Sequence, residues 1–398
     1  MCYINIMKIT GIIAEYNPFH NGHQYQIDTV RESGSDYIIA VLSGDFTQRG
    51  EPAIVDKYAR TAMALSGGVD LVLELPVVYA TADAGRFAKG GVSLLNNLGV
   101  VDELAFGVEE GSEETVLSLA EFLTDPPALY DATLDDYLRK GYSYPLARAK
   151  ALELYYAPDK LTNLDKPNTI LAIEYCRAIK DLRSAMKPRA ITRKGSDYSE
   201  TELDVDGMSS ASAIRLLLSE TFDEELLLKH MPSPSVKILK EAGLMYRKDF
   251  SSFLHYRLIN ETDFTGFLDV TGPFGNRLSS CRNEYIDFDS FIDVMKSKNI
   301  THTSVSRLLT HIMLGIPGNI PMVAPYARVL GFRKSAEPLL TQIKKNSHIP
   351  LVTKLADSDI HSCLETDIAS AHIYEAAVTD KYHTKIHNEY ERQIVITD

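Results

Sequence analysis

The first turn between a strand-like and a helix-like segment constrains the fold of this chain more than any other feature. The apolar run Ile9–Ala14 predicts a buried strand, and residues 22–33 predict a helix. A strand that passes directly into a helix directs the helix N–H groups at the turn, where the helix dipole favours an anion. His20 and His23 flank Asn21-Gly22 in this turn. Imidazoles there can donate hydrogen bonds to phosphate oxygens, so the turn predicts a triphosphate site; the alternative is an ordinary turn with incidental histidines.

The same alternation continues through the first half of the chain. Strands are predicted at 9–16, 37–42, 69–75, 103–108 and 189–193, and helices at 22–33, 57–66, 83–98, 169–183 and 209–218. Strands separated by helices predict an α/β fold with a Rossmann-like parallel sheet covered on both faces. Right-handed crossovers place the loops that follow the strands at one edge of the sheet. His20, Asp45 and Gly107 are therefore expected to converge there.

The second half of the chain lacks this alternation. The acidic and polar stretch 220–225 is the predicted boundary between an α/β domain of residues 7–220 and a mostly helical C-terminal domain of residues 221–398. The proline-rich segment 317–325 is expected to separate two subdomains of the latter. Residues 1–6 precede the first strand and receive no role.

The formal net charge of −13 argues by itself against a nucleic-acid partner. The charge is segregated, however. Residues 101–140 hold 11 acidic and 2 basic residues, a net of −9, whereas residues 301–350 hold 6 basic residues and 1 acidic residue, a net of +5. A local basic face is compatible with RNA, and the alternative is a pair of solvated surfaces.

The remaining composition predicts a cytoplasmic protein without a metal site. No apolar run is long enough to span a bilayer, and the N-terminus lacks the basic region and long apolar core of a signal peptide. The four cysteines are scattered, with no Cys-x-x-Cys pair for zinc or redox chemistry. His383 and His387 have a spacing found in zinc sites, but no third ligand is near, and a solvated polar helix is the favoured interpretation.

A second candidate phosphate site is Met208-Ser209-Ser210-Ala211-Ser212-Ala213-Ile214-Arg215. Hydroxyl side chains at a helix start cap it and leave backbone N–H groups for a phosphate. Arg215 lies about two turns along this helix, where it would hold a β- or γ-phosphate. The alternative is an ordinary serine cap with a surface arginine.

Together these elements resemble the nucleotidylyltransferase superfamily, whose enzymes cleave ATP between its α- and β-phosphates. His-x-Gly-His at the first strand–helix turn is similar to the first signature of that superfamily, and residues 208–215 are similar to the second, of the Ile-Ser-Ser-Thr-x-Ile-Arg type. Ala211 and Ser212 depart from the second pattern. The two motifs in this order are far more specific than either one alone.

Further motifs narrow the resemblance to the tRNA(Met) cytidine acetate ligase family over nearly the whole chain. The block from Glu15 to His23, together with Gln48-Arg49-Gly50-Glu51-Pro52, is specific to that family. The other similar segments are Asp56-Lys57-Tyr58-Ala59-Arg60, Phe106-Gly107-Val108-Glu109, Lys166-Pro167-Asn168, Arg193-Lys194-Gly195-Ser196-Asp197-Tyr198, Arg307-Leu308-Leu309, Gly315-Ile316-Pro317 and Arg328-Val329-Leu330-Gly331-Phe332.

The resemblance implies an ATP-dependent ligase. Enzymes of this family form acetyl-adenylate and pyrophosphate from acetate and ATP, and then transfer the acetyl group to N4 of the wobble cytidine of elongator tRNA(Met). The ATP contacts that the resemblance implies are Ile13, Ala14, Glu15, Tyr16, Asn17, Pro18, Phe19, His20, Asn21, Gly22, His23, Gln24, Tyr25, Gln26, Gly107, Asn168 and Arg193. Gly107 would admit the nucleoside close to the backbone, Asn168 offers a donor and an acceptor, and Arg193 is a permanent cation. The alternative for Asn168 is a helix cap, and the alternative for Arg193 is a surface charge.

The first step needs no general base, because acetate is already ionised near neutral pH. The enzyme must instead hold two anions together and neutralise the growing charge. His20, His23, Arg193 and Arg215 are the candidates, with Mg²⁺ bridging the phosphates. Lys57 is a further candidate, and a solvated helix lysine is its alternative. No base for the transfer to cytidine is identified.

Basic residues of the C-terminal part are expected to contact phosphates of the tRNA; they are Arg307, Arg328, Arg333 and Lys334. Two other functions stay open: an adenylyltransferase acting on a small metabolite, and a non-catalytic RNA-binding protein with a nucleotidyltransferase-like fold. The long C-terminal part favours a macromolecular substrate, and intact His20, His23 and Arg215 favour an enzyme.

Overall fold

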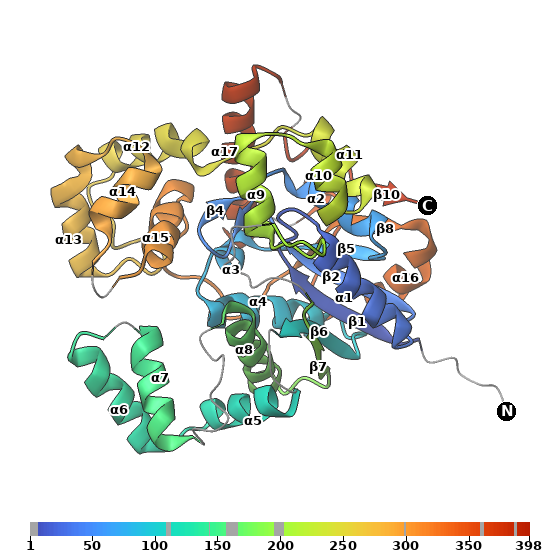
Figure 1. Ribbon diagram of the computed structural model, residues 1–398, viewed down its shortest axis with the longest axis horizontal. Helices are drawn as coiled ribbons and strands as arrows, with labels where there is room; N and C mark the ends of the chain where they lie inside the picture. Colours follow the sequence, from blue (N-terminus) through green and yellow to red (C-terminus); the bar gives the residue numbers. More distant parts are fainter. Residues whose placement is uncertain are drawn as a thin grey trace.

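A mixed β-sheet forms the centre of the molecule (Figure 1). The computed structural model describes residues 7–108, 113–142, 144–156, 166–194, 203–297, 300–358, 362–385 and 388–398. Within that part the strand order is β10-β8-β5-β2-β1-β6-β7, with β9 beside β8. The strands are β1 (Ile9–Ala14), β2 (Tyr37–Ser43), β5 (Leu71–Leu75), β6 (Glu103–Val108), β7 (Lys187–Thr192), β8 (Ala327–Arg333), β9 (Leu351–Val352) and β10 (Val395–Thr397), and a separate hairpin joins β3 (Phe46–Thr47) to β4 (Glu51–Pro52).

The middle of the sheet is the parallel unit expected from the sequence. β1 pairs in parallel with β2 and β6, β2 pairs with β5, and β6 pairs with β7. Ala14 lies opposite Leu42, and Gly107 lies opposite Ile191. The carboxyl ends of these strands therefore share one edge of the sheet, where the turn after β1 and Gly107 both lie. This confirms the predicted α/β fold.

Alternating side chains of the strands build a core on each face of the sheet. On β2, Ile38 and Leu42 belong to one core and Ile39 belongs to the other. The first core is covered by α1 (Asn21–Glu32), α2 (Lys57–Ser66), α9 (Ala211–Glu220), α10 (Glu224–His230) and α11 (Ser233–Glu241). The second core includes side chains of α3 (Val77–Ala80), α4 (Ala84–Asn97), α5 (Glu113–Thr124), α8 (Pro167–Asp181), α16 (Glu337–Asn346) and α17 (Ser362–Tyr382).

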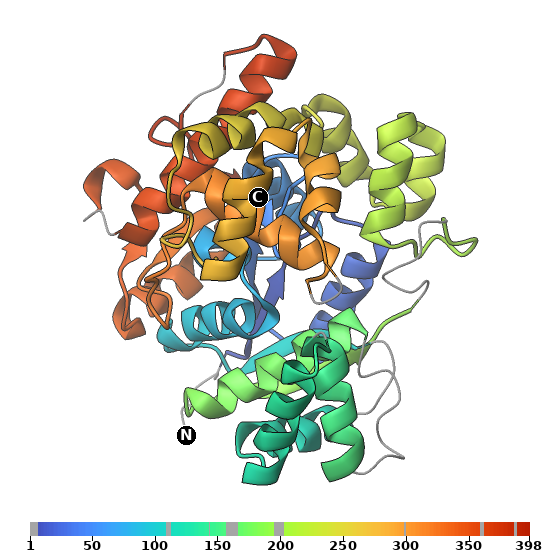
Figure 2. The same cartoon turned by 90° about the vertical axis from the view of Figure 1, so that its left-hand side faces the viewer.

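Two helical parts extend from this centre. One contains α12 (Ser251–Asn260), α13 (Gly272–Cys281), α14 (Phe288–Met295) and α15 (His302–Leu314), and Figure 2 shows it facing the viewer. The other is a pair of helices, α6 (Ala128–Arg139) and α7 (Tyr144–Tyr155), set apart from the sheet in Figure 1. Short 3₁₀ helices are η2 (Arg247–Phe250), η3 (Arg282–Glu284), η4 (Lys334–Ala336) and η5 (Leu355–Asp357).

The sheet crosses the domain boundary predicted at 220–225. β8 pairs antiparallel with β5, and β10 extends the sheet beyond β8. β5 is buried along its whole length, and without β8 it would be an unprotected edge strand. The C-terminal part is mostly helical, as expected, but it also completes the sheet of the N-terminal part.

Two smaller findings concern the C-terminal helix and membrane spans. α17 ends at Tyr382, and His383 follows with a left-handed backbone (φ 54°), so the helix predicted around His383 has already ended. His387 lies outside the described residues. Over the described ranges, no helix combines the length and apolar character that crossing a membrane requires.

Candidate active site

The turn after β1 begins α1 with a histidine cap. His20 is the N-cap residue, and its Nδ1 accepts a hydrogen bond from the N–H of Gly22 at 3.0 Å. The N–H of His20 donates to Nδ1 of His23 at 3.2 Å. A Cβ on Gly22 would lie 2.9 Å from Cε1 of His20. The cap therefore requires a residue without a side chain at position 22.

The two imidazole rings lie against each other, with centroids 3.7 Å apart. Because each Nδ1 accepts a hydrogen bond, the proton of each neutral ring is assigned to Nε2. Burial, with Arg193 and Arg215 nearby, lowers the pKa of His20 to about 3. Burial, His20 and Arg193 likewise lower the pKa of His23. Near pH 7 both rings are neutral Nε2–H donors, which suits phosphate oxygens.

Tyr16 gives this turn its shape. Its φ of 46° lies in the left-handed region, which costs a non-glycine residue on the order of 1–3 kcal/mol. The buried ring makes edge contacts with Phe19 and His23, with centroids 5.0 and 4.8 Å away. Oδ1 of Asn17 accepts the N–H of Ile54 at 2.7 Å. These contacts hold the turn in its strained conformation.

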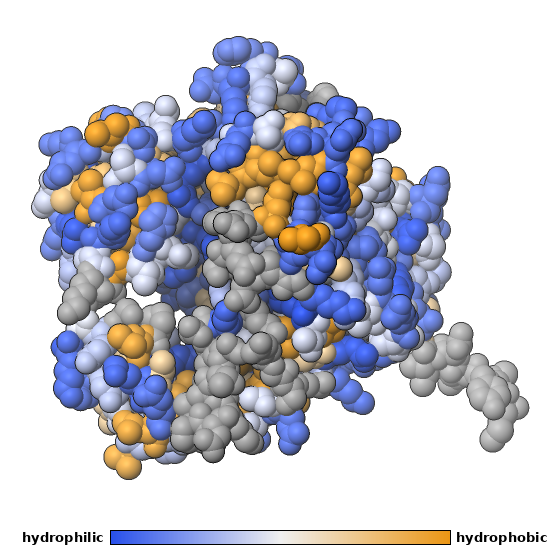
Figure 3. Space-filling view, in the orientation of Figure 1, coloured by the Kyte–Doolittle hydropathy of each residue, from blue (hydrophilic) through white to orange (hydrophobic). Residues whose placement is uncertain are grey.

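A cavity of about 880 Å³ lies beside the two histidines. Its walls come from the turn after β1, the β3–β4 turn, the start of α4, the end of β6, α7, α8, the residues after β7 and the start of α15. Its volume is near the upper end of the range of small-molecule sites, about 300–1,000 Å³. Figure 3 shows the surface hollowed between the α12–α15 part and the α6–α7 part. The cavity lies at the carboxyl edge of the sheet, where α/β folds bind ligands.

Most of the predicted ATP contacts between residues 13 and 26 line this cavity; they are Ile13, Ala14, Glu15, Tyr16, Asn17, His20, Gly22, His23, Tyr25 and Gln26. Pro18, Phe19, Asn21 and Gln24 are not among the lining residues. Asn21 donates to the carbonyls of Gly207 and Lys229, and Gln24 donates to the carbonyl of Gly67. These residues fix the turn to its surroundings.

Gly107, Asn168 and Arg193 also line the cavity. A Cβ on Gly107 would lie 3.2 Å from Cγ of Arg193, so the glycine lets the arginine side chain pass close to the end of β6. Asn168 is the second residue of α8, and the N-terminus of this helix also faces the cavity. The structure therefore brings together residues from three distant segments that the family resemblance placed in one site.

The turn of the β3–β4 hairpin connects the cavity to α15. Gly50 has a left-handed φ of 68°, and a Cβ there would lie 2.5 Å from the backbone nitrogen of Arg307. The hydroxyls of Ser306 and Thr310 donate to the carbonyl of Gly50 at 2.7 and 2.9 Å. This close packing places Gln48 and Arg49 of the hairpin, and the first turn of α15, in the cavity wall.

Arg215 lies behind the turn and does not line the cavity. Its Nη1 donates to the carbonyl of Asn17 at 2.8 Å, and its Nη2 lies 3.8 Å from Oε2 of Glu51. Ser210 caps α9 as expected, because its hydroxyl accepts the N–H of Ala213 at 3.1 Å. Arg215 is close enough to lower the pKa of His20, so its charge acts on the site through the turn.

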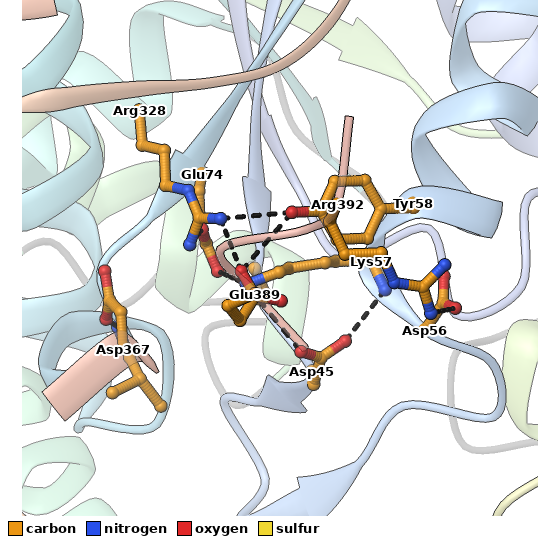
Figure 4. A network of polar contacts seen from close by, with 12 residues as sticks. Asp45, Asp56, Lys57, Tyr58, Glu74, Arg328, Asp367, Glu389 and Arg392 are labelled. Carbon is orange, nitrogen blue, oxygen red and sulfur yellow. Dashed lines mark hydrogen bonds and ion pairs between the residues drawn. The ribbon is translucent and has the colours of Figure 1, made fainter. Parts of the chain in front are cut away.

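Lys57 and Asp45 belong to a buried ionic cluster, which we define as Asp45, Lys57, Glu74, Arg328 and Glu389 (Figure 4). Lys57 is 1% exposed, and its Nζ lies 2.7 Å from Glu74, 3.1 Å from Glu389 and 3.8 Å from Asp45. Neither Lys57 nor Asp45 lines the cavity. Asp45 follows β2 at the same edge of the sheet as His20 and Gly107, but it does not join them in the cavity. Lys57 is neither a cavity residue nor a solvated helix lysine. Lys57 is buried because it pairs with Glu74 and Glu389, and Glu389 is a distant partner that local patterns do not reveal.

The four basic residues expected to contact tRNA lie in different environments. Arg328 is buried in the ionic cluster, 3.0 Å from Glu74 and bonded to Glu389, so it is not available to an RNA phosphate. Arg307 lines the cavity. Arg333 ends β8, and exposed Lys334 pairs with Asp398. The expectation that Arg328 contacts a tRNA phosphate is therefore wrong.

Several cavity residues were not assigned to the site from the sequence; they are Gln48, Arg49, Asp83, Arg148, Glu174, Tyr175, Arg177, Thr303 and Ser304. Helical periodicity along α8, from Asn168 through Leu171 to Glu174, is the signal that would have found Glu174. The residues of α7 and α15 carry no such signal, because only the folded chain brings them to the sheet edge. For the residues that the structure describes, no group of three or more His, Cys, Asp or Glu side chains could hold a metal ion.

Comparison with families and curated proteins gives consistent matches over the chain. The model of the HIGH nucleotidyl transferase family matches residues 7–389. A tRNA(Met) cytidine acetate ligase of Clostridium acetobutylicum is 37% identical, covering 98% of this chain and 100% of that protein. A protein of the same name from Thermoanaerobacter sp. is 40% identical, covering 88% of this chain and 89% of that protein.

Solved structures show the same fold. The apo crystal structure of Thermotoga maritima TmcAL has a TM-score of 0.90 at 30% identity, covering 98% of this chain and 100% of that one. The structure of that protein bound with alpha-thio ATP has a TM-score of 0.89 at 30% identity, with the same coverage. This chain belongs to the tRNA(Met) cytidine acetate ligase family within the HIGH nucleotidyl transferases.

Proposed function

We propose that this protein is an ATP-dependent ligase that forms acetyl-adenylate from acetate and ATP and transfers the acetyl group to N4 of the wobble cytidine of elongator tRNA(Met). The names of its relatives support the reaction, and the TmcAL structure with alpha-thio ATP supports nucleotide binding at this fold. The observation that carries the proposal is the pair of neutral imidazoles at the start of α1, with Arg193 beside them in one cavity.

In the first step, an acetate oxygen attacks the α-phosphorus, the bond to the bridging oxygen of the β-phosphate breaks, and pyrophosphate leaves. Negative charge grows on the phosphate oxygens. The Nε2–H groups of His20 and His23 would donate to these oxygens, and Arg193 would supply a positive charge beside them. Arg215 would add its charge from behind the turn. These donors are fixed before the substrate binds, so little reorganisation is needed.

Mg²⁺ would accompany ATP as part of the substrate. Because the described side chains form no three-ligand carboxylate or histidine group, the phosphate oxygens themselves would hold most of the ion. The ion would neutralise charge on the polyphosphate.

The second step brings RNA to the same cavity. A wobble base can be unstacked and inserted because it lies in a single-stranded loop. Arg307 and the first turn of α15 also line the cavity, and Arg307 would meet an RNA phosphate near the reacting base. Arg333 and Lys334 are further candidates for the outer part of the tRNA.

The test has two readouts. Acetate-dependent exchange of label between pyrophosphate and ATP reports the first step, and mass spectrometry of tRNA nucleosides after incubation with ATP and labelled acetate reports the second. We expect exchange with acetate and labelled N4-acetylcytidine in tRNA(Met). Exchange only with another acid would indicate a small-metabolite adenylyltransferase, and the absence of exchange would indicate a binding protein.

A further inference from the structure

Glu15 is one of the ATP contacts that the resemblance implies, but its carboxylate has no role in the chemistry of the proposed first step. It follows β1 directly and lines the cavity next to the histidine turn. Its Oε1 accepts the N–H of Gln48 at 2.9 Å. Among the described residues, its Oε2 has no hydrogen-bond partner. A carboxylate oxygen in a site of this kind is expected to meet a donor on the substrate.

The position of Glu15 is fixed from two sides. Nη1 of Arg60 donates to its carbonyl at 2.8 Å, and Gln48 holds its side chain from the β3–β4 turn. Arg60 is itself completely buried and also donates to the carbonyl of Ser43 at 2.9 Å. The free oxygen is therefore presented to the cavity by a rigid support, as a group that meets a substrate must be.

The chemistry of the two steps decides which substrate Glu15 meets. Acetate and the ATP phosphates are anions, and a carboxylate would repel both. The cytosine amine, in contrast, carries two N–H donors, and a carboxylate is a standard acceptor for cytosine N4. The amine must also lose a proton when it is acylated. The transfer step is thus the one that calls for a carboxylate.

We propose that Glu15 is the residue that receives the cytidine amine, with Oε2 accepting a hydrogen bond from N4–H and then taking that proton. This inference rests on the proposed function. N4 forms a bond to the carbonyl carbon of acetyl-adenylate, the bond from that carbon to the phosphate oxygen breaks, and AMP leaves with the electron pair. One proton moves from N4 to Glu15, which later returns it to solvent.

The surroundings of Glu15 match this role. Burial raises its pKa, and the Gln48 hydrogen bond and the charges of Arg215 and Arg49 oppose that rise only in part. Glu51 of the hairpin raises the pKa further, and Arg60 of α2 and Tyr175 of α8 are the other titratable groups close by. A carboxylate with a raised pKa is a stronger proton acceptor than an ordinary one. The same contact selects cytidine, because uridine presents a carbonyl oxygen to Oε2 instead of an amine.

The variant Glu15→Gln keeps the size of the side chain and removes the proton acceptor. We expect the ratio of the acetyl-transfer rate to the acetate-dependent exchange rate to fall by about 100-fold or more. Glu15→Asp keeps a carboxylate and should recover part of the ratio. In the native protein the transfer rate should fall as the pH drops through the pKa of Glu15, and this acid limb should disappear in Glu15→Gln.

Glu174→Gln is the matched control, because Glu174 is another cavity carboxylate but both its oxygens bond to Arg177. We expect it to change both rates by a common factor. If Glu15→Gln lost exchange and transfer equally, the side chain would act in ATP binding and the assignment would be overturned. A native ratio of the transfer rate to the exchange rate, with the acid limb of the pH profile retained, would overturn it as well. Exchange by the native protein is measured first, and its absence would overturn the proposed function and this assignment with it.

Discussion

His20 and His23 each use one ring nitrogen for structure and leave the other for chemistry. Each Nδ1 accepts a backbone N–H at the start of α1, so each Nε2–H is free of that task. A substitution that keeps the capping hydrogen bond but removes the Nε2–H donor separates the structural role from the catalytic role. Asparagine makes such a substitution, since it caps helices well but is shorter than histidine.

We expect His20→Asn and His23→Asn each to lower acetate-dependent ATP–pyrophosphate exchange by about 100-fold, the typical loss for one removed donor to a developing oxyanion. The thermal midpoint should change little for His20→Asn, because the cap is kept. His348→Asn is the control, since His348 is exposed. Full exchange activity in both variants would contradict the assigned roles.

The low pKa values of the two histidines make stability depend on pH. In the unfolded chain a histidine binds a proton below about pH 6.5, whereas His20 in the folded protein does so only near pH 3. Between these values the unfolded state binds more protons, so the free energy of unfolding should decrease as the pH falls, by at most about 1.4 kcal/mol per pH unit for each histidine. Urea unfolding of the ligand-free protein between pH 7 and pH 5 measures this slope, which should be shallower in His20→Asn. An unchanged slope would show that the ring is protonated in the folded state.

At the scale of elements, the β3–β4 hairpin depends on a glycine that packs against α15. Gly50→Ala would place a Cβ at a left-handed residue and against the backbone of Arg307. We expect a loss of about 2–4 kcal/mol in the free energy of unfolding, from about 1 kcal/mol of backbone strain and about 1–3 kcal/mol of overpacking. The KM for ATP should rise as well, because Gln48 and Arg49 move with the hairpin.

Gly34→Ala provides the matched control for this prediction. Gly34 also has a left-handed φ, of 86°, but a Cβ there would meet no atom within 4 Å. It should lose only the backbone contribution, about 1 kcal/mol, and keep the native KM. Urea unfolding measures the free energy of unfolding of both variants. Equal losses would show that the contact of position 50 with α15 does not contribute to stability.

Local patterns predicted several strands and helices around the central sheet, and the reason is physical. Residues 57–66 and 103–108 match the bounds of α2 and β6, since apolar periodicity and flanking turn residues are local signals. The contact of Gly50 with Arg307 joins residues more than 250 positions apart, and no local signal reports it. The free oxygen of Glu15 was equally hidden, because it depends on which neighbours Glu15 lacks after folding.

At the scale of the whole molecule, the ionic cluster joins the two halves of the chain. Lys57 and Glu74 come from the N-terminal half, and Arg328 and Glu389 come from the C-terminal half. The neighbouring cations lower the pKa of Glu389, and the surrounding carboxylates raise the pKa of Lys57, each against the cost of burial. The charges of this cluster are thus kept in the interior by their mutual attraction. The sequence showed Arg328 only as one of six cations in a basic segment, which is why it was assigned to tRNA.

Arg328→Met tests whether this arginine serves the fold or the tRNA. The change leaves Glu74 and Glu389 buried with Lys57 as their remaining cation in the cluster, and we expect the free energy of unfolding to fall by about 3–5 kcal/mol. Lys334→Met is the control, because Lys334 follows the same strand but is exposed and pairs with exposed Asp398, so no measurable change in stability is expected. Urea unfolding measures stability, and a filter-binding assay at a temperature where both variants are folded measures tRNA affinity. If Arg328→Met kept the native free energy of unfolding and bound tRNA more weakly, Arg328 would be a tRNA contact and not a structural residue.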